Sequence, residues 1–299
     1  MILITTPTGD IGSQLVRMLL DSTDTALRVI ARDPARIPAG LRDRIDVVTG
    51  SHYDPAVLDR ALDGADALFW NAAPNPAAAT LDEVYAGAAA TAAELLAAHG
   101  TGHVVTVSAL GRGTSHQADA GLVTASLAMD DALSAAVPNF RALANASFMD
   151  NLLRQTAQLR DTGVFSGPMP AQSRQPTVAT RDIAAAAARL LLDRAWTGSA
   201  EEPLLGPEDL SPDEQSATVS AVLGRQVTYR QEPLDSVETR LLGFGASPAF
   251  AGGMAAMVRA KAEHGLDTGI PRTPAAATAA PTTFHQWCER VLKPALARS

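Results

Sequence analysis

The segment that opens the chain constrains its fold most. An apolar run, ILIT, passes through the turn TPTG directly into DIG and a helical pattern. A buried strand followed at once by a tight turn and a helix is typical of the start of a parallel α/β fold. Unpaired backbone N–H groups and the positive end of the helix dipole stabilise a phosphate at such a helix start. The segment therefore predicts a pyrophosphate site formed by Thr6, Thr8, Gly9, Asp10, Ile11 and Gly12.

The residues of this turn have separate expected roles. Gly9 lets the backbone approach the ligand, and Gly12 permits close packing of the helix on the strand. Thr6 replaces the first glycine of the G-x-x-G-x-x-G pattern, and a threonine tolerates less backbone freedom there. An ordinary strand, turn and helix is the alternative interpretation, and the surrounding pattern favours the dinucleotide site more than the glycines do.

Short β-rich runs alternate with helical spacing through residue 150, which predicts a parallel sheet covered by crossover helices. The expected strands are Ile2–Thr5, Leu27–Ala31, Asp46–Val48, Ala67–Trp70, His103–Val107 and Phe140–Leu143. The predicted fold class is α/β, a Rossmann-type doubly wound parallel sheet with a smaller C-terminal α+β substrate lobe. We expect residues 1–150 to form the dinucleotide-binding domain and 151–299 mainly the substrate or lid lobe, with the helix at 182–193 packing back onto the first domain.

The pattern after residue 150 is less regular, with proline and glycine interrupting it repeatedly. Val227–Arg230 predicts a short strand, and the glycine and alanine segment Gly243–Gly253 predicts a hinge or a cap. Pro271–Pro281 predicts a loop before a final helix that contains Trp287.

The end of the second strand carries arginine where a site for NAD usually carries an acid. Arg32 follows LRVIA about 20 residues after Gly12, at the position that contacts the ribose hydroxyls. A guanidinium makes charge-assisted contacts to phosphate, and Arg36 is close enough in sequence to contribute. NADP(H) is therefore expected in preference to NAD(H). The alternative is that both arginines are solvated residues at a helix start, balanced by Asp33.

Small residues follow two later strands, at the edge where open α/β sheets bind ligands. Asn71, Ala72 and Ala73 come after LFW, and Ser108 comes after VVTV. We expect all four to line the cofactor site, because small side chains leave room for a nucleotide.

Composition excludes several classes of partner. The chain has 24 Lys and Arg against 32 Asp and Glu, which argues against a nucleic acid or an anionic membrane as partner. Its single cysteine, Cys288, fits a reducing compartment, and no apolar run approaches the ~20 residues that span a bilayer. The sequence thus predicts a cytoplasmic protein with a small-molecule substrate and no metal, as a monomer or homodimer.

The whole chain resembles the NmrA-like family, an atypical branch of the short-chain dehydrogenases/reductases that includes quinone reductases and cofactor-sensing regulators. The resemblance rests on TPTGDIG, VIARDP, HVVTVSALG, NFRALANASFMDNLL, TRDIAAAAARLLLD and GPEDLSPDEQSATVSAVLGRQVTY, in that order. It implies NAD(P) binding, and it implies that Phe148, Met149 and Asn151 line the substrate pocket, to which we add Leu110. Core packing is the alternative role for the first three. The family usually has an Arg-Pro pair where this chain has Ala144 and Asn145.

The chain lacks the Tyr-x-x-x-Lys pair with which most short-chain dehydrogenases move a proton. Its only lysines are Lys261 and Lys293, and none of its three tyrosines lies four residues before a lysine. Three polar residues remain as catalytic candidates in the first half: Ser108 could hydrogen-bond a carbonyl, and His116 or Asp119 could donate a proton. Solvated loop residues are the alternative interpretation.

Chemistry that needs little help with protons fits this residue set best. Hydride addition to a quinone leaves an oxygen with a pKa near ~10, whereas a simple ketone gives an alkoxide near ~16. We therefore expect an NAD(P)H-dependent reductase of a quinone or an activated enone or carbonyl compound. The alternatives are a non-catalytic NADP(H)-sensing regulator and a fold diverted to a non-redox reaction such as dehydration or cyclisation.

Overall fold

The computed structural model describes residues 1–22 and 24–298, which divide into two compact units. The first unit contains Met1–Ala109, Ala125–Ala144 and Ile183–Glu202, and the second contains Leu110–Thr124, Asn145–Asp182 and the chain from Pro203 onward. The helix expected at 182–193 belongs to the first unit from Ile183 onward, whereas Leu110–Thr124, expected in the first domain, belong to the second unit.

A seven-stranded sheet forms the centre of the first unit, in the order β10-β6-β5-β4-β1-β2-β3. The strands are β1 (Ile2–Ile4), β2 (Leu27–Ala31), β3 (Asp46–Thr49), β4 (Ala67–Trp70), β5 (His103–Ala109), β6 (Asn139–Asn145) and β10 (Gly198–Leu204). The pairs β1–β2, β2–β3, β1–β4 and β4–β5 are all parallel. Strand order reverses beside β1, so the sheet is doubly wound, and the expected Rossmann-type α/β class is confirmed.

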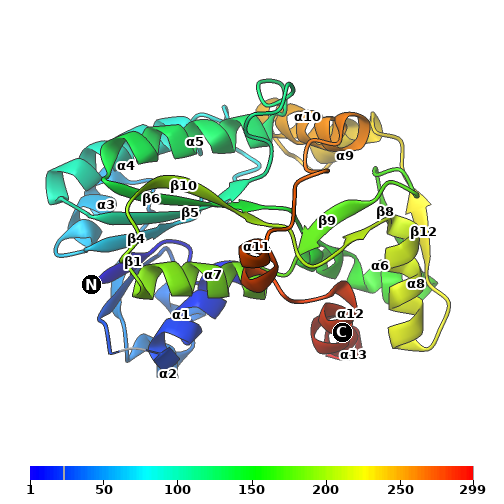
Figure 1. Cartoon of the computed structure of the whole chain (residues 1–299), viewed down its shortest axis with the longest axis horizontal. Helices are drawn as coiled ribbons and strands as arrows, with labels where there is room; N and C mark the ends of the chain where they lie inside the picture. The colour runs from blue at the N-terminus through cyan, green and yellow to red at the C-terminus, as the bar shows by residue number, and fades with distance from the viewer. Residues whose placement is uncertain (23, 299) are drawn as a thin grey trace. The chain divides into compact units, whose positions relative to one another are not determined.

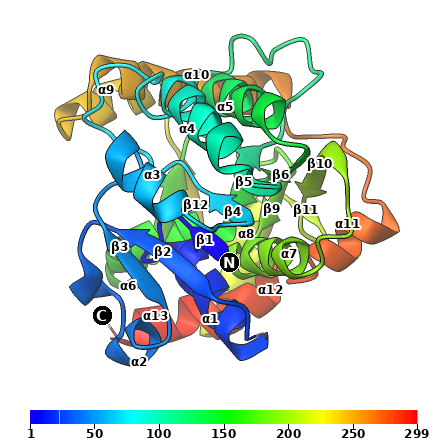
Figure 2. The ribbon, with the colours of Figure 1, turned by 90° about the vertical axis from the view of Figure 1, so that its left-hand side faces the viewer.

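Helices cover both faces of this sheet (Figures 1 and 2). They are α1 (Asp10–Ser22), η1 (Pro34–Arg36), α2 (Ala39–Arg42), α3 (Pro55–Leu62), α4 (Ala86–His99), α5 (Leu122–Ala136) and α7 (Thr180–Leu192). Both views place α1 and α7 on one face and α3, α4 and α5 on the other. Strands β1 and β4 are consequently buried on both sides, and every residue from Ile2 to Ile4 is fully buried.

The six expected strands are present, with ends that shift by one or two residues. Strand β10 was not expected, because its sequence GSAEEPL carries acidic residues and a proline and its first four residues are exposed. An edge strand of this kind has no apolar alternation from which it could be predicted.

The second unit contains smaller sheets and many short helices. Its strands are β7 (Ser147–Phe148), β8 (Val164–Gly167), β9 (Gln175–Val178), β11 (Asp209–Leu210) and β12 (Thr228–Gln231). Its helices are η2 (Met149–Gln155), α6 (Thr156–Thr162), α8 (Pro212–Leu223), α9 (Ser236–Gly243), α10 (Pro248–His264), α11 (Pro274–Ala279), α12 (Phe284–Trp287), η3 (Cys288–Leu292) and α13 (Lys293–Arg298). The strands form two sheets, in the orders β11-β9-β7 and β12-β8.

Two expectations for the second unit are corrected in part. Of the hinge or cap expected at Gly243–Gly253, the structure contains the cap: α10 begins at Pro248, where the Ser247 side chain accepts a hydrogen bond from the backbone N–H of Phe250. The expected loop Pro271–Pro281 contains α11, which the Thr273 side chain caps in the same way. In both places an N-cap residue followed by proline starts a helix, although the low complexity of the segment predicted irregular structure.

The second unit has its own hydrophobic core, in which Phe284, Trp287 and Cys288 are each at most 1% exposed. Burial raises the pKa of the Cys288 thiol to about 12, so this cysteine packs as an apolar group. No helix in the described part of the chain is both long enough and apolar enough to cross a membrane.

Candidate functional site

The turn after β1 holds an unusual backbone conformation at Thr6. Its φ angle is 50°, in the left-handed region that favours glycine, and among the described residues no other side-chain-bearing residue has a positive φ. The Thr6 carbonyl accepts a hydrogen bond from the N–H of Gly9 at 3.1 Å. The Thr6 hydroxyl accepts one from Nδ2 of Asn71 at 3.1 Å. Thr6 therefore keeps the conformation of the glycine that it replaces, and hydrogen bonds on both sides hold it there.

Gly12 is required where it stands, as expected. A Cβ atom at this position would lie 2.2 Å from the Thr6 carbonyl oxygen, so no other residue fits without moving the turn. A Cβ at Gly9 would meet the same oxygen at 3.5 Å, an ordinary contact. The first turn of α1 thus lies directly against the strand end, with Asp10 at its start. This arrangement fits a pyrophosphate held by backbone N–H groups.

The carboxyl ends of β1 and β4 are tied together beside the turn. The Thr5 hydroxyl donates to the Phe69 carbonyl at 3.1 Å and accepts the Asn71 N–H at 2.9 Å. Next along the chain, Ala72 is buried, and the Ala73 carbonyl accepts a hydrogen bond from the Tyr53 hydroxyl at 3.1 Å. The first unit therefore brings Asn71 to the predicted turn.

The two arginines of the expected 2′-phosphate site occupy different surroundings. Arg36 lines a cavity of about 210 Å³ together with Arg17, Thr8 and other residues of the turn, α1 and α2. Arg32 is exposed after β2. Burial and the charge of Arg32 lower the pKa of His52 to about 4. The cavity thus has two guanidinium groups beside the turn. The charge of Arg32, by contrast, disfavours protonation of His52, which follows β3.

Ser108 is engaged by a buried acid. Its hydroxyl donates to Oδ2 of Asp130, and the Thr106 hydroxyl donates to Oδ1 of the same side chain at 2.8 Å. Asp130 is 1% exposed and lies on α5. The hydrogen of the Ser108 hydroxyl therefore points toward Asp130.

The expected pocket residues and the second catalytic candidate lie in the second unit. Leu110 and Met149 are buried, Phe148 is half-buried and Asn151 is exposed. Met149 belongs to the core cluster of that unit, which is the alternative role considered for it. The His116 ring stacks on His264, with centroids 3.9 Å apart and planes 5° from parallel. The structure therefore gives His116 a packing partner that the sequence did not suggest.

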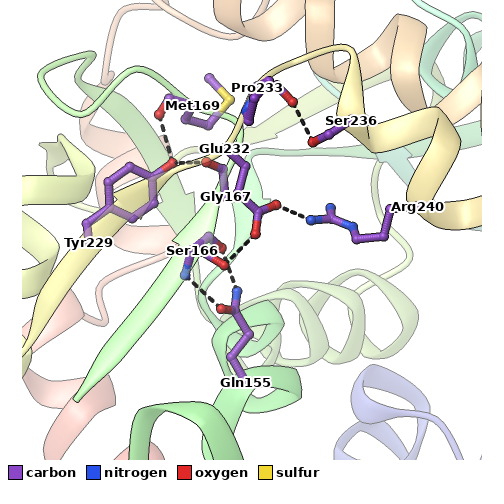
Figure 3. A network of polar contacts seen from close by, with 9 residues as sticks. All are labelled: Gln155, Ser166, Gly167, Met169, Tyr229, Glu232, Pro233, Ser236 and Arg240. Carbon is purple, nitrogen blue, oxygen red and sulfur yellow. Dashed lines mark hydrogen bonds and ion pairs between the residues drawn. The ribbon is translucent and has the colours of Figure 1, made fainter. Parts of the chain in front are cut away.

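A polar network fixes β8 and β12 in the second unit (Figure 3). The Ser166 hydroxyl donates to Glu232 at 2.7 Å, and Glu232 also pairs with Arg240 of α9. Burial would raise the pKa of Glu232, but these two partners outweigh it and leave the pKa lowered. The Tyr229 hydroxyl lies 2.5 Å from the Gly167 carbonyl, and burial raises the pKa of Tyr229, so it remains neutral. These contacts hold the two strands and the last turn of α9 together.

The doubly wound sheet and the turn at Thr6–Gly12 define a nucleotide-binding protein of the Rossmann class. The family model described as NAD(P)H-binding matches residues 7–194. The chain belongs to this NAD(P)H-binding family. The NAD(P)(H) binding expected from the sequence is thereby confirmed. The regulator NmrA, solved in complex with NAD, has the same fold, with a TM-score of 0.75 at 15% identity over 99% of this chain and 97% of its own.

Similar proteins agree with this placement. The (4-alkanoyl-5-oxo-2,5-dihydrofuran-3-yl)methyl phosphate reductase of Streptomyces griseus is 30% identical, over 81% of this chain and 80% of its own length. The NAD(P)H azoreductase of Xenophilus azovorans is 28% identical, over 85% of each chain. The NADPH-dependent quinone oxidoreductase QOR2 of Escherichia coli, solved with NADPH, has a TM-score of 0.80 at 21% identity and covers 98% of this chain and 100% of its own. The expected class, an NAD(P)H-dependent oxidoreductase, is confirmed.

Sequence reasoning missed one polar cluster, formed in the second unit by Ser147, Lys261 and Asp267. Ser147 lies 114 residues before Lys261, and the three residues belong to no recognised motif. The one signal in the sequence was the scarcity of lysine, because only two of the 24 Lys and Arg residues are lysines. One of these two, Lys261, is buried in the structure.

Proposed function

We propose that the protein uses NADPH to reduce a small acceptor whose reduced form is a weak base, such as a quinone or an activated enone. The observation that carries this proposal is the state of Ser108. Its hydroxyl donates to Asp130, and no Tyr-x-x-x-Lys pair exists in the chain to protonate an alkoxide. An acceptor that becomes a phenolate-like anion requires less protonation during the reaction than a simple ketone does.

The names of the relatives support an activated acceptor. They describe reductases of an unsaturated furanone phosphate, of azo compounds, of quinones and of triphenylmethane dyes. In each of these acceptors the added electrons enter a conjugated system. We therefore extend that chemical class, rather than any one of those substrates, to this chain.

The residues of the first unit have assigned tasks in this proposal. A reduced nicotinamide, when bound, supplies the hydride. The N–H groups at the start of α1 hold the pyrophosphate, and Thr6 and Asn71 hold the turn in its left-handed conformation. Asp130 accepts a hydrogen bond from the Ser108 hydroxyl, and this bond fixes the rotamer of the serine.

A preference for NADPH over NADH rests on charge. Arg36 and Arg17 line the cavity beside the turn, and Arg32 is exposed at the end of β2, where the adenosine ribose is bound in doubly wound folds. Within residues 1–22 and 24–298, the side chains that line this cavity include no acid. A 2′-phosphate placed there gains ion-paired and often bidentate hydrogen bonds from the guanidinium groups, whereas a neutral ribose hydroxyl can accept only a weaker hydrogen bond without ion pairing.

Calorimetric titration with NADPH, NADP⁺, NADH and NAD⁺ tests the preference, with Arg32→Ala and Arg36→Ala alongside the parent. We expect NADPH to bind more tightly than NADH. Each variant should raise the dissociation constant of NADPH by about tenfold and leave that of NADH unchanged. Arg60→Ala, on the remote helix α3, is the matched control. Equal affinities for NADPH and NADH would refute the preference.

Turnover is tested by NADPH oxidation with quinones, activated enones and simple ketones. The proposal predicts turnover with the first two classes and none with simple ketones. Faster reduction of simple ketones than of quinones would contradict it.

A further inference from the structure

The cavity beside the nucleotide turn belongs entirely to the first unit. Its volume of about 210 Å³ is smaller than the roughly 300–1,000 Å³ of sites that enclose a drug-sized ligand. It therefore has room for one chemical group of a larger molecule, or for a small ion, and not for a whole dinucleotide. Four of the residues that line it are polar, namely Thr8, Ser13, Arg17 and Arg36.

Helix α1 presents a hydroxyl and a guanidinium to this cavity. Ser13 and Arg17 are four residues apart, so their side chains are neighbours on one face of the helix. The buried side of α1 contains Leu15 and Leu19 instead. Ser13 is half-buried and Arg17 is exposed, so a ligand in the cavity can reach both side chains.

The guanidinium groups of the cavity are unpaired. Across residues 1–22 and 24–298, the side chains of Arg17 and Arg36 make no hydrogen bond and no ion pair. Asp33, the acid closest in sequence to Arg36, accepts a hydrogen bond from a backbone N–H of η1 at 3.0 Å. By contrast, Arg44 of the same unit donates to the Leu20 carbonyl at 2.7 Å. Two positive charges that face one cavity repel each other, and a bound anion removes that repulsion.

The donors of the cavity match a phosphate group. Each guanidinium offers several N–H donors in a planar fork, and the hydroxyls of Thr8 and Ser13 offer one donor each. A phosphate monoester has three strong acceptor oxygens and a charge close to −2, whereas a carboxylate has two oxygens and a single charge. Two arginines and two hydroxyls therefore suit a phosphate dianion better than a carboxylate.

The walls of the cavity are held in place without a ligand. The N–H of Ile37 donates to the Pro34 carbonyl at 3.1 Å, and the Asp33 side chain caps η1 from the other end. Ile37 is 3% exposed and lines the cavity together with Leu41 of α2. These contacts fix the backbone that carries Arg36. A site that is already formed pays less ordering entropy when a ligand binds.

We propose that this cavity is a binding site for a phosphate dianion held by Arg17 and Arg36, and that it accepts free inorganic phosphate as well as the 2′-phosphate of NADPH. The inference rests on the proposed preference for NADPH and extends it in two ways. Arg17 becomes a residue that determines cofactor specificity, although the rule for the end of the second strand does not indicate it. Inorganic phosphate competes with NADPH but not with NADH, so its concentration regulates which cofactor the protein binds.

Arg17→Gln is the first test, measured by calorimetric titration with NADPH and NADH. We expect the dissociation constant of NADPH to rise about tenfold, because one charge-assisted contact is lost. The dissociation constant of NADH and the melting temperature should stay unchanged. Arg60→Gln, on the remote helix α3, is the matched control and should bind both cofactors as the parent does. An unchanged NADPH affinity in Arg17→Gln would overturn the role of Arg17.

Inorganic phosphate is the second probe. The titrations are repeated at about pH 8 in sodium phosphate and in sodium chloride of equal ionic strength, so that phosphate is a dianion and general screening is matched. Phosphate should raise the apparent dissociation constant of NADPH several-fold relative to chloride and leave that of NADH unchanged. The effect should be much smaller in Arg17→Gln. Equal weakening of both cofactors would place phosphate at the pyrophosphate position and overturn the inference, and so would no effect on either.

Failure of this site and failure of the proposed function give different results. Selective competition by phosphate, without NADPH oxidation by any acceptor, would keep the cavity as a phosphate site and overturn the proposed reduction. NADPH oxidation that neither phosphate nor Arg17→Gln affects would keep the reduction and overturn the site.

Discussion

The two polar sites of this protein are built in opposite ways. In the first unit, Thr6, Gly9 and Gly12 lie within seven consecutive residues, and the backbone conformation of the turn determines the shape of the site. In the second unit, Ser147 lies more than a hundred residues before Lys261 and Asp267, and hydrogen bonds from the Lys261 ammonium connect the three side chains. The first kind of site can be recognised in a sequence as a motif, whereas the second becomes visible only once the chain has folded.

This difference predicts which kind of substitution damages each unit, and the largest effect is expected in the second. Asp267→Ala leaves the Lys261 ammonium buried without its carboxylate, so we expect a loss of about 3–5 kcal/mol in the free energy of unfolding. Urea denaturation measures it. The double variant Lys261→Met, Asp267→Leu should recover most of the loss, because it removes both charges. The exposed Asp235, paired with Arg259, supplies the control, and Asp235→Ala should change little.

A second prediction concerns the buried base of the first unit. Burial, assisted by Arg32, lowers the pKa of His52 to about 4 from its ordinary value of 6.5. Between these values the unfolded chain binds a proton that the folded chain does not, so stability falls as the pH drops from 6.5 toward 4. We expect His52 to account for a loss of up to about 3 kcal/mol over this range.

Denaturation at a series of pH values, with His52→Phe as the comparison, checks this expectation. The variant should show a flatter pH profile between 6.5 and 4. Arg32→Ala should raise the pKa of His52 in an NMR titration, because it removes a positive charge. An unchanged titration in that variant would show that burial alone sets the pKa.

In the turn of the first unit, stability should depend on the volume of a substituted side chain and not on its charge. Gly12→Ala places a methyl group 2.2 Å from the Thr6 carbonyl oxygen, so we expect a loss of about 1–3 kcal/mol together with weaker NADPH binding. Gly9→Ala is the matched comparison, since its methyl group would lie 3.5 Å from the same oxygen and should leave stability unchanged. Equal melting temperatures for the two variants would mean that the turn moves to accommodate either residue.

The same contrast explains what the sequence could and could not predict. The sheet, its strands and the nucleotide turn follow from local patterns, namely apolar runs, a helix start and two glycines. Strand β10 was missed because an exposed edge strand needs no apolar pattern. The engagement of Ser108 by Asp130 was also missed, because an acid on a helix is most often solvated, and only tertiary packing buries this one. The Lys261 cluster was missed for the same reason, as no spacing rule connects residues 147 and 261.

The smallest effect tests whether Thr6 is strained. At a φ of 50° a threonine or alanine costs about 1 kcal/mol that glycine does not, and both Thr6→Gly and Thr6→Ala remove the hydroxyl that Asn71 contacts. We therefore expect the free energy of unfolding of Thr6→Gly to exceed that of Thr6→Ala by about 1 kcal/mol, as measured by urea denaturation. Ser134, within helix α5, provides the reverse case, since there alanine should be more stable than glycine by a similar amount. If the two pairs rank glycine and alanine alike, the left-handed turn is not a feature of the protein in solution, and the backbone site of the first unit loses its distinction from the charged site of the second.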